Sequence, residues 1–251
     1  MNKKYVFIID LDETIIGNCI YQSQMWNIGK AYNININKIL LSYYKEPSKL
    51  LRPYFIHFIK KMRELYNENV YFYIYTASTY EWANAEIKLI EKANNIKFNR
   101  PIFTRNDCIK PKKSLYWIKS IDKIKSKIKV KNADYIIIDD SNVYSDNNNL
   151  QLFCRPYQYK AFCNISSYIP LKTIPDFCKG IICPFIDLTD DNSNIKMYRW
   201  LYKKCKKIEK LNIQYKYDKF WLNLTNVIEK NKITDFNEDI IKQLTTIANN
   251  Y

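Results

Sequence analysis

Two aspartates separated by one leucine follow an apolar run near the start of the chain. Asp10 and Asp12 come directly after residues 5–9, whose sequence is Tyr-Val-Phe-Ile-Ile. Such a short apolar run predicts a strand that is buried on both faces of a parallel sheet. If the extended backbone continues through Leu11, both carboxylates project to the same side of the chain. A divalent cation would then offset their repulsion, and oxygen ligands of this kind suit Mg²⁺.

Strand-end aspartates also have an ordinary structural explanation, because Asp favours turns and helix caps. Two further apolar runs weigh against that explanation here. Residues 70–75 predict a strand that ends at Thr76, and residues 135–138 predict another that ends at Asp139 and Asp140. Ligands of open α/β sheets bind outside the carboxyl ends of the strands, so these side chains would converge in one crevice.

Helical periodicity fills the intervals between these strands. Apolar residues recur at helical spacing after Leu51–Pro53 and between Tyr80 and about Asn94, and a shorter helix is expected over Leu115–Ile121. The alternation of strands and helices predicts an α/β fold with a doubly wound parallel sheet. We expect one such domain over residues 1–160 and a mainly helical extension over 161–251, packed on it or beside it.

Composition narrows the classes of protein that the chain can belong to. The 251 residues are 47% hydrophobic, which favours a packed core over disorder. With 3 glycines and neither a GxGxxG nor a GxxxxGK[ST] pattern, the two commonest nucleotide-binding loops are excluded. The chain has 7 cysteines, an odd number whose spacing does not suggest a disulfide framework. It shows no apolar leader and no apolar run long enough to span a membrane. These features predict an intracellular protein with no membrane partner.

The formal charge of +15 favours a polyanionic partner such as nucleic acid or a phosphorylated, acidic segment. A predicted basic helix over residues 196–210 is the clearest candidate surface. The alternative is a solvated outer face, since Lys, Asn, Ile and Tyr are frequent throughout the chain, as an AT-rich genome would produce.

The predicted crevice has the parts that phosphoryl transfer needs. An ionised Asp10 can attack phosphorus and form an aspartyl-phosphate, which water then opens. Asp12 would protonate the leaving oxygen and later deprotonate the water. Mg²⁺ bound by Asp10, Asp12 and the Asp139/Asp140 pair would orient the phosphate.

Two further side chains can bind the oxygens of the transferred phosphoryl group. Thr76 offers a hydroxyl and Lys113 offers a cation, at the oxygens where transition-state charge is spread. Lys110 and Lys112 lie close to Lys113 and are alternatives to it.

These residues resemble the haloacid-dehalogenase (HAD) phosphatases, because Asp10–Thr14 matches their DxDxT signature. The longer pattern is similar to the subgroup that acts on the C-terminal domain of RNA polymerase II, the NLI-interacting-factor-like phosphatases. That similarity covers about residues 1–160 and includes Leu51–Tyr54, Tyr75–Ala83, Arg105–Cys108, Lys113–Leu115, Ile138–Ser141 and Arg155–Tyr157. The resemblance implies a HAD-like fold with little or no cap. It also implies Asp10 as nucleophile, Asp12 as acid/base with its main-chain carbonyl on Mg²⁺, Thr76 and Lys113 as phosphate ligands and Asp140 as a metal ligand.

We therefore expect a Mg²⁺-dependent phosphatase that acts on phosphoserine or phosphothreonine in a protein, with an RNA polymerase tail as one such substrate. The alternatives are a phosphatase of nucleic-acid 3′ or 5′ ends, which the basic charge supports, and a catalytically silent binding protein on the same fold. The cytoplasm, the nucleus or a viral factory would be the compartment, since the composition and the resemblance point to a virus or a unicellular eukaryote.

Overall fold

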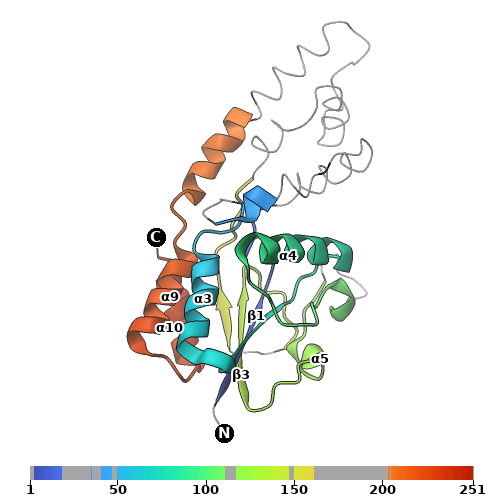
Figure 1. Cartoon of the computed structure of the whole chain (residues 1–251), viewed down its shortest axis with the longest axis vertical. Coiled ribbons are helices and arrows are strands. Elements are labelled where there is room, and N and C mark those ends of the chain that lie inside the picture. Colours follow the sequence, from blue (N-terminus) through green and yellow to red (C-terminus); the bar gives the residue numbers. More distant parts are fainter. Residues whose placement is uncertain are drawn as a thin grey trace, which may run out of the picture.

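The computed structural model describes residues 3–18, 35, 41–46, 50–110, 117–146, 150–160, 203 and 205–250. Its centre is a parallel sheet in the order β2-β1-β3-β4 (Figure 1). The strands are β1 (Lys4–Ile9), β2 (Val70–Ile74), β3 (Ala133–Asp139) and β4 (Gln151–Phe153). The prediction of a parallel α/β sheet with the first apolar run at its centre is confirmed.

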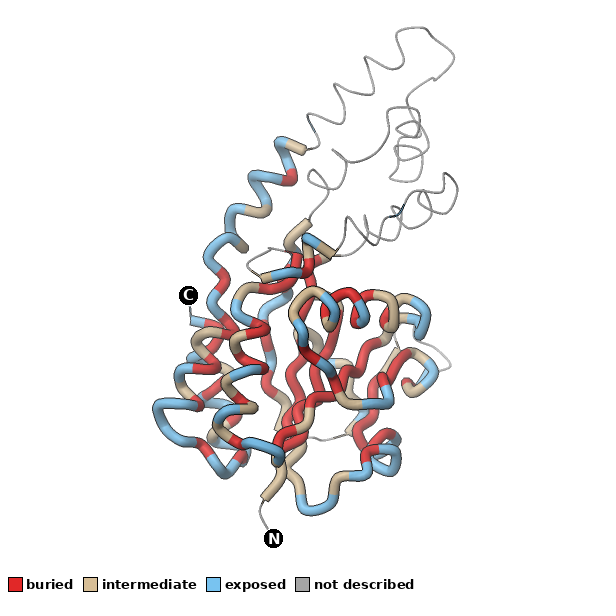
Figure 2. The backbone as a smooth tube through the Cα atoms, in the orientation of Figure 1, coloured by how far each residue is buried: buried red, intermediate tan, exposed pale blue. Residues whose placement is uncertain are grey.

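Alternate residues of β1 enter two separate cores, one on each face of the sheet. Tyr5, Phe7 and Ile9 belong to the larger core, whereas Val6 and Ile8 belong to the smaller one. All five are buried, and the strands form the buried centre of the molecule (Figure 2). This period-2 alternation explains why an unbroken apolar run was needed to form the strand.

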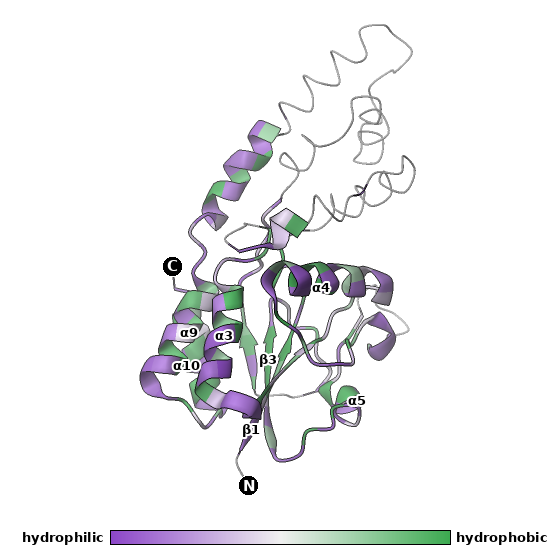
Figure 3. Cartoon of the chain, viewed as in Figure 1, coloured by the Kyte–Doolittle hydropathy of each residue, from purple (hydrophilic) through white to green (hydrophobic). Residues whose placement is uncertain are grey.

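Helices cover both faces of this sheet. They are α3 (Phe55–Tyr66), α4 (Tyr80–Asn94), α5 (Ile121–Lys125), α9 (Phe220–Asn231) and α10 (Glu238–Ala248). Short 3₁₀ turns lie at Asn67–Asn69, Arg105–Asp107 and Ile213–Tyr215. Buried side chains of α3, α4, α9 and α10 line the larger core, and those of α5 line the smaller one. Hydrophobic and hydrophilic residues lie on different sides of these helices, so each helix has an apolar side (Figure 3).

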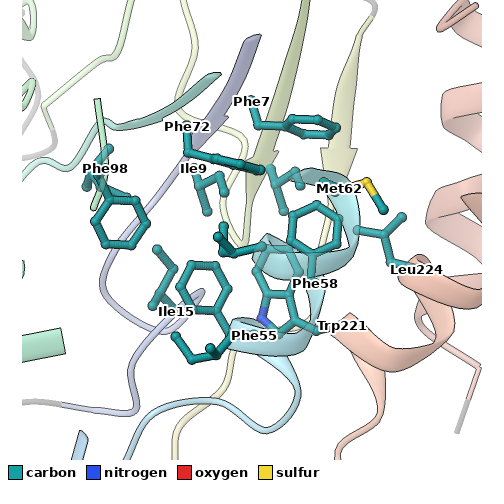
Figure 4. Close-up of a cluster of buried hydrophobic side chains, with 14 of the residues drawn as sticks. Phe7, Ile9, Ile15, Phe55, Phe58, Met62, Phe72, Phe98, Trp221 and Leu224 are labelled. Carbon is teal, nitrogen blue, oxygen red and sulfur yellow. The ribbon is translucent and has the colours of Figure 1, made fainter. Parts of the chain in front are cut away.

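The C-terminal helices are part of the larger core. The Trp221 ring of α9 lies 4.8 Å from the Phe58 ring and 5.0 Å from the Phe55 ring of α3, measured between centroids (Figure 4). Leu224, Ile228 and Leu244 are buried in the same cluster. The extension therefore covers one face of the sheet together with α3.

Two of the helix boundaries expected from the sequence are wrong. Helix α3 begins at Phe55, because Leu51 pairs with Ile16 and the Arg52 N–H donates to the carbonyl of Ile15. The expected helix over 115–121 is contradicted in its described part, where Ile118 and Lys119 make isolated β-bridges before α5 begins at Ile121. The predicted span of α4 is confirmed.

Most of the predicted basic helix over 196–210 lies outside the described residues. Within the described part, residues 205–212 are helical and largely exposed. Among the helices that the structure describes, none combines the length and the apolar character needed to cross a membrane.

A buried ion pair joins the start of α3 to the start of α9. Arg52 donates from Nε and Nη2 to the two carboxylate oxygens of Asp218, at 3.1 and 2.9 Å. Both side chains are buried, with exposed fractions of 0% and 1%. The Arg52 guanidinium also lies over the rings of Phe220 and Tyr157, at 4.6 and 5.4 Å from the centroids. Because Asp218 accepts in addition from the Phe220 N–H, the pair also fixes the first turn of α9.

Removing one partner of this pair should destabilise the whole fold. We expect Asp218→Asn to lower the free energy of unfolding by about 3–5 kcal/mol, because it leaves the Arg52 charge buried without its counter-charge. Urea unfolding followed by circular dichroism measures this change. The matched control is Lys125→Met, which breaks the exposed Lys125–Asp122 pair and should change stability little. Equal effects of the two variants would contradict the structural role of the buried pair.

Candidate active site

Asp10 lies at the carboxyl end of β1, on the side of the smaller core. It follows Ile9 and continues the alternation of Val6 and Ile8, so its side chain faces away from the larger core. The Asp10 N–H donates to the carbonyl of Ile138 at 2.9 Å, which brings Asp10 beside Asp139, the last residue of β3. Both aspartates are buried, with exposed fractions of 6% and 0%. Two buried carboxylates at adjacent strand ends need a counter-charge.

Lys119 supplies that counter-charge. Its Nζ atom lies 2.5 Å from Asp10 Oδ1 and 2.7 Å from Asp139 Oδ2, and its side chain is 2% exposed. Burial alone would lower the pKa of Lys119, but the charges of Asp10 and Asp139 outweigh this and raise it, so the amine is an ammonium ion. The rings of Tyr75 and Tyr144 flank this ammonium, with centroids 5.7 and 5.8 Å away.

The backbone around Lys119 explains how the side chain reaches the crevice. Its N–H donates to the carbonyl of Val143, so residue 119 runs alongside the loop that follows β3. The next residue, Ser120, caps α5 by accepting from the Lys123 N–H at 3.2 Å. A lysine placed between an extended segment and a helix start is thereby fixed at its backbone on both sides.

The sequence predicted Lys113 as the cation that binds the phosphoryl oxygens, and Lys113 lies outside the described residues. Lys119 was missed because it was assigned to a helix over 115–121. A usable signal was present, since Trp117, Ile118 and Ile121 surround Lys119 with apolar residues and Ser120 is a typical N-cap.

Three carboxylates in the crevice could hold a metal ion. One oxygen each from Asp10, Asp139 and Asp140 lies within 4.8 Å of the others. Asp140 is oriented by Thr14, whose hydroxyl donates to Asp140 Oδ1 at 3.2 Å. The sequence correctly expected these residues to meet at one edge of the sheet.

The charges of this crevice fit a divalent cation. Burial raises the pKa of Asp10, and the charges of Asp139, Asp12 and Asp140 add to this effect, while Lys119 opposes it. Burial and the charge of Asp139 raise the pKa of Asp140 to about 6. When all three carboxylates are ionised, they exceed the one ammonium by two negative charges, which an oxygen-binding divalent ion would balance.

The carboxylate of Asp139 is fixed from several directions. Its Oδ1 accepts from the N–H and the hydroxyl of Ser141, at 2.9 and 2.7 Å, and its Oδ2 accepts from the hydroxyl of Tyr144 at 3.0 Å. These contacts orient the anion that holds Lys119 beside Asp10.

Asp12 has different neighbours from Asp10. Strand β1 ends at Ile9, and Asp12 makes an isolated β-bridge with Ile16, directly before Glu13, whose φ is 61°. Its Oδ2 accepts from the hydroxyls of Thr76 and Ser78, at 3.2 and 2.7 Å. Its Oδ1 accepts from the indole N–H of Trp82 at 3.3 Å. Asp12 is thus absent from the carboxylate group that could hold a metal, although the sequence placed it there.

Several of these side chains border one open pocket of about 400 Å³. Its lining includes Asp10, Asp12, Thr76, Ser78, Arg105, Trp117, Lys119 and Asp140. Trp117 and Arg105 are additions to the residues expected from the sequence. In the described part of the chain, no separate cap domain stands between β2 and Lys119. Such a site can accept a phosphate that projects from a larger molecule.

Several solved structures show similarity to this chain. A variant of the fission yeast RNA polymerase II CTD phosphatase Fcp1, bound to beryllium fluoride, is 17% identical with a TM-score of 0.40. That match covers 98% of this chain and 61% of the other, so this chain spans less than two thirds of that protein. A second structure of Fcp1, described as an essential RNA polymerase II CTD phosphatase, is 17% identical over 96% of this chain and 70% of the other, with a TM-score of 0.41.

The HAD domain of the effector protein Lem4 from Legionella pneumophila is a third similar structure. It is 14% identical over 57% of this chain and 75% of the other, with a TM-score of 0.33. No curated protein matches the sequence. The family model of NLI interacting factor-like phosphatases matches residues 5–164, which is more than half of the chain and includes the pocket. This chain therefore belongs to the family of NLI interacting factor-like phosphatases.

Proposed function

We propose that this protein is a Mg²⁺-dependent phosphatase that hydrolyses phosphate monoesters through an aspartyl-phosphate on Asp10. The observation that carries the proposal is the position of Asp10, which lies at a strand end beside Lys119 and borders the 400 Å³ pocket. Family membership supports the reaction class.

In the first step, a carboxylate oxygen of Asp10 attacks the phosphorus atom, and the bond to the alcohol oxygen of the substrate breaks. Asp12 donates its proton to that leaving oxygen. In the second step, Asp12 takes a proton from water, the water oxygen attacks the same phosphorus, and the carboxylate of Asp10 is released with inorganic phosphate. Thr76 and Lys119 stabilise the negative charge on the phosphoryl oxygens.

The carboxylates of Asp10, Asp139 and Asp140 would hold Mg²⁺, and the family resemblance adds the main-chain carbonyl of Asp12. When bound, the ion supplies positive charge that shields Asp10 from the anionic phosphate and orients the phosphate for attack.

The substrate class that fits the pocket best is a phosphoserine or phosphothreonine in a protein, because an open site admits a macromolecule. The described C-terminal region supports a second candidate substrate, a phosphate at a nucleic-acid end, because its exposed lysines could attract a polyanion. These lysines are Lys203, Lys206, Lys207, Lys210, Lys216 and Lys219. A phosphopeptide should be hydrolysed with a higher kcat/KM than a 3′- or 5′-phosphorylated oligonucleotide, and the reverse order would assign the protein to nucleic-acid ends.

Asp10→Asn should abolish hydrolysis of an aryl phosphate, because an amide cannot act as the nucleophile. The wild-type enzyme should require Mg²⁺ and lose activity when the ion is chelated. Phosphate release, measured for both proteins with and without Mg²⁺, tests this. Asp107→Asn, a change in an acidic residue outside the pocket lining, is the matched control and should keep its activity. Activity in Asp10→Asn, or full activity without a divalent ion, would overturn the proposal.

Lys119→Met should lower kcat by about 10²–10³, the range seen when one preorganised charge-stabilising donor is removed. The same change should also lower the free energy of unfolding, since it leaves buried carboxylates without their ammonium. Lys113→Met is the comparison that decides between the lysine expected from sequence and the lysine in the crevice. A larger loss of kcat in Lys113→Met than in Lys119→Met would contradict the assignment of Lys119.

A further inference from the structure

Trp82 contacts the carboxylate of Asp12 from the first turn of α4. Thr79 caps this helix, and its hydroxyl accepts from the Trp82 N–H at 3.5 Å. The cap fixes where the helix begins and so fixes the direction in which the Trp82 side chain leaves it. The half-buried indole donates from Nε1 to Asp12 Oδ1 at 3.3 Å.

The two oxygens of Asp12 therefore have different partners. Oδ2 accepts from Thr76 and Ser78, which belong to the segment directly after β2. Oδ1 accepts from Trp82, which belongs to a helix. Donors from two elements fix the direction of the Asp12 carboxylate, which could rotate more freely if donors from one element alone held it.

Such a constraint matters because Asp12 does not lie on a strand. It lies beyond the end of β1, in an isolated β-bridge with Ile16 directly before the positive φ of Glu13, so the hydrogen-bond ladder of β1 does not fix the direction of its side chain. A general acid must be within hydrogen-bond reach of the oxygen that it protonates. The direction of the carboxylate is thus set by its hydrogen-bond donors.

We propose that Trp82 is a positioning residue that orients Asp12 for proton transfer to the leaving oxygen and from water. This inference rests on the proposed function, in which Asp12 is the acid and base. Trp82 does not touch the reacting atoms; it acts through the carboxylate that does. Its indole N–H is the part that matters, rather than the bulk of its ring.

The dependence of the rate on the leaving group tests this role. Trp82→Phe keeps an aromatic ring and removes the N–H. An aryl phosphate with an acidic leaving group needs little protonation, whereas a phosphoserine peptide releases a strongly basic alkoxide and depends on the general acid. We expect kcat/KM, which reports the steps up to release of the alcohol, to fall roughly tenfold for the phosphopeptide in Trp82→Phe, a fraction of the 10²–10⁴ that general acid catalysis contributes, and to change by less than about twofold for the aryl phosphate.

Two comparisons separate positioning from simple damage to the pocket. In kcat/KM, Asp12→Asn should show the same selectivity for poor leaving groups and a larger loss, and adding Trp82→Phe to it should cause no further loss. Tyr80→Phe removes a hydroxyl from the same helix at an exposed position and should have no effect on either substrate. Equal losses of kcat/KM on both substrates in Trp82→Phe, or no loss on either, would overturn the proposal.

A measurement without turnover tests the contact itself. The indole N–H resonance of Trp82 in the nuclear magnetic resonance spectrum is assigned by its disappearance in Trp82→Phe. Asp12→Asn should shift this resonance, because it removes the charge of the acceptor. An unshifted resonance would contradict the inference even if the enzyme is a phosphatase. A shifted resonance in a protein whose Asp10→Asn variant retains activity would leave the contact in place and refute the proposed reaction instead.

Discussion

The ammonium of Lys119, placed between Asp10 and Asp139, is the interaction on which the site depends. Burying two carboxylates at adjacent strand ends is costly unless a positive charge pairs with them. Lys119 meets both at 2.5 and 2.7 Å, and its own burial is compensated by the same contacts. The parallel register of β1 and β3 makes the arrangement feasible, because it brings the two strand ends side by side. The sheet, the lysine and the three carboxylates thus form one electrostatic unit.

A second buried ion pair stabilises the fold, as the contacts of Lys119 stabilise the site. Arg52 and Asp218 join the start of α3 to the start of α9, across 166 residues of sequence. Arg52 also donates its N–H to the carbonyl of Ile15, so the same residue supports the segment directly after Asp12. We propose that the C-terminal helices are needed for stability of the phosphatase domain, since Trp221 and Leu224 complete its larger core.

Apolar runs in the sequence predicted the features of the structure that depend on residues close together in the chain. The apolar runs identified β1, β2 and β3, and the convergence of Asp10, Thr76 and Asp139 followed from the parallel sheet. The long-range pairs were beyond such patterns, because nothing in the sequence near Arg52 indicates a partner at Asp218. The lysine was a similar case. Several lysines follow residue 109, and although apolar neighbours in the sequence favour Lys119, it is the tertiary fold that places it beside Val143 and Tyr144. The hydrogen-bond donors to Asp12 also lie far away in the sequence, in residues 76–82, so the residues around Asp12 do not indicate them.

The central claim is that Asp10 is the nucleophile that forms an aspartyl-phosphate intermediate. Identifying the phosphorylated residue tests this claim most directly. The Asp12→Asn variant should form the intermediate with an aryl phosphate and hydrolyse it slowly, because the water lacks its base. Rapid acid quenching followed by peptide mass spectrometry would locate the phosphoryl group. The account predicts the group on Asp10, and its loss in the Asp10→Asn/Asp12→Asn double variant. A phosphoryl group on another residue, with none on Asp10, would contradict it.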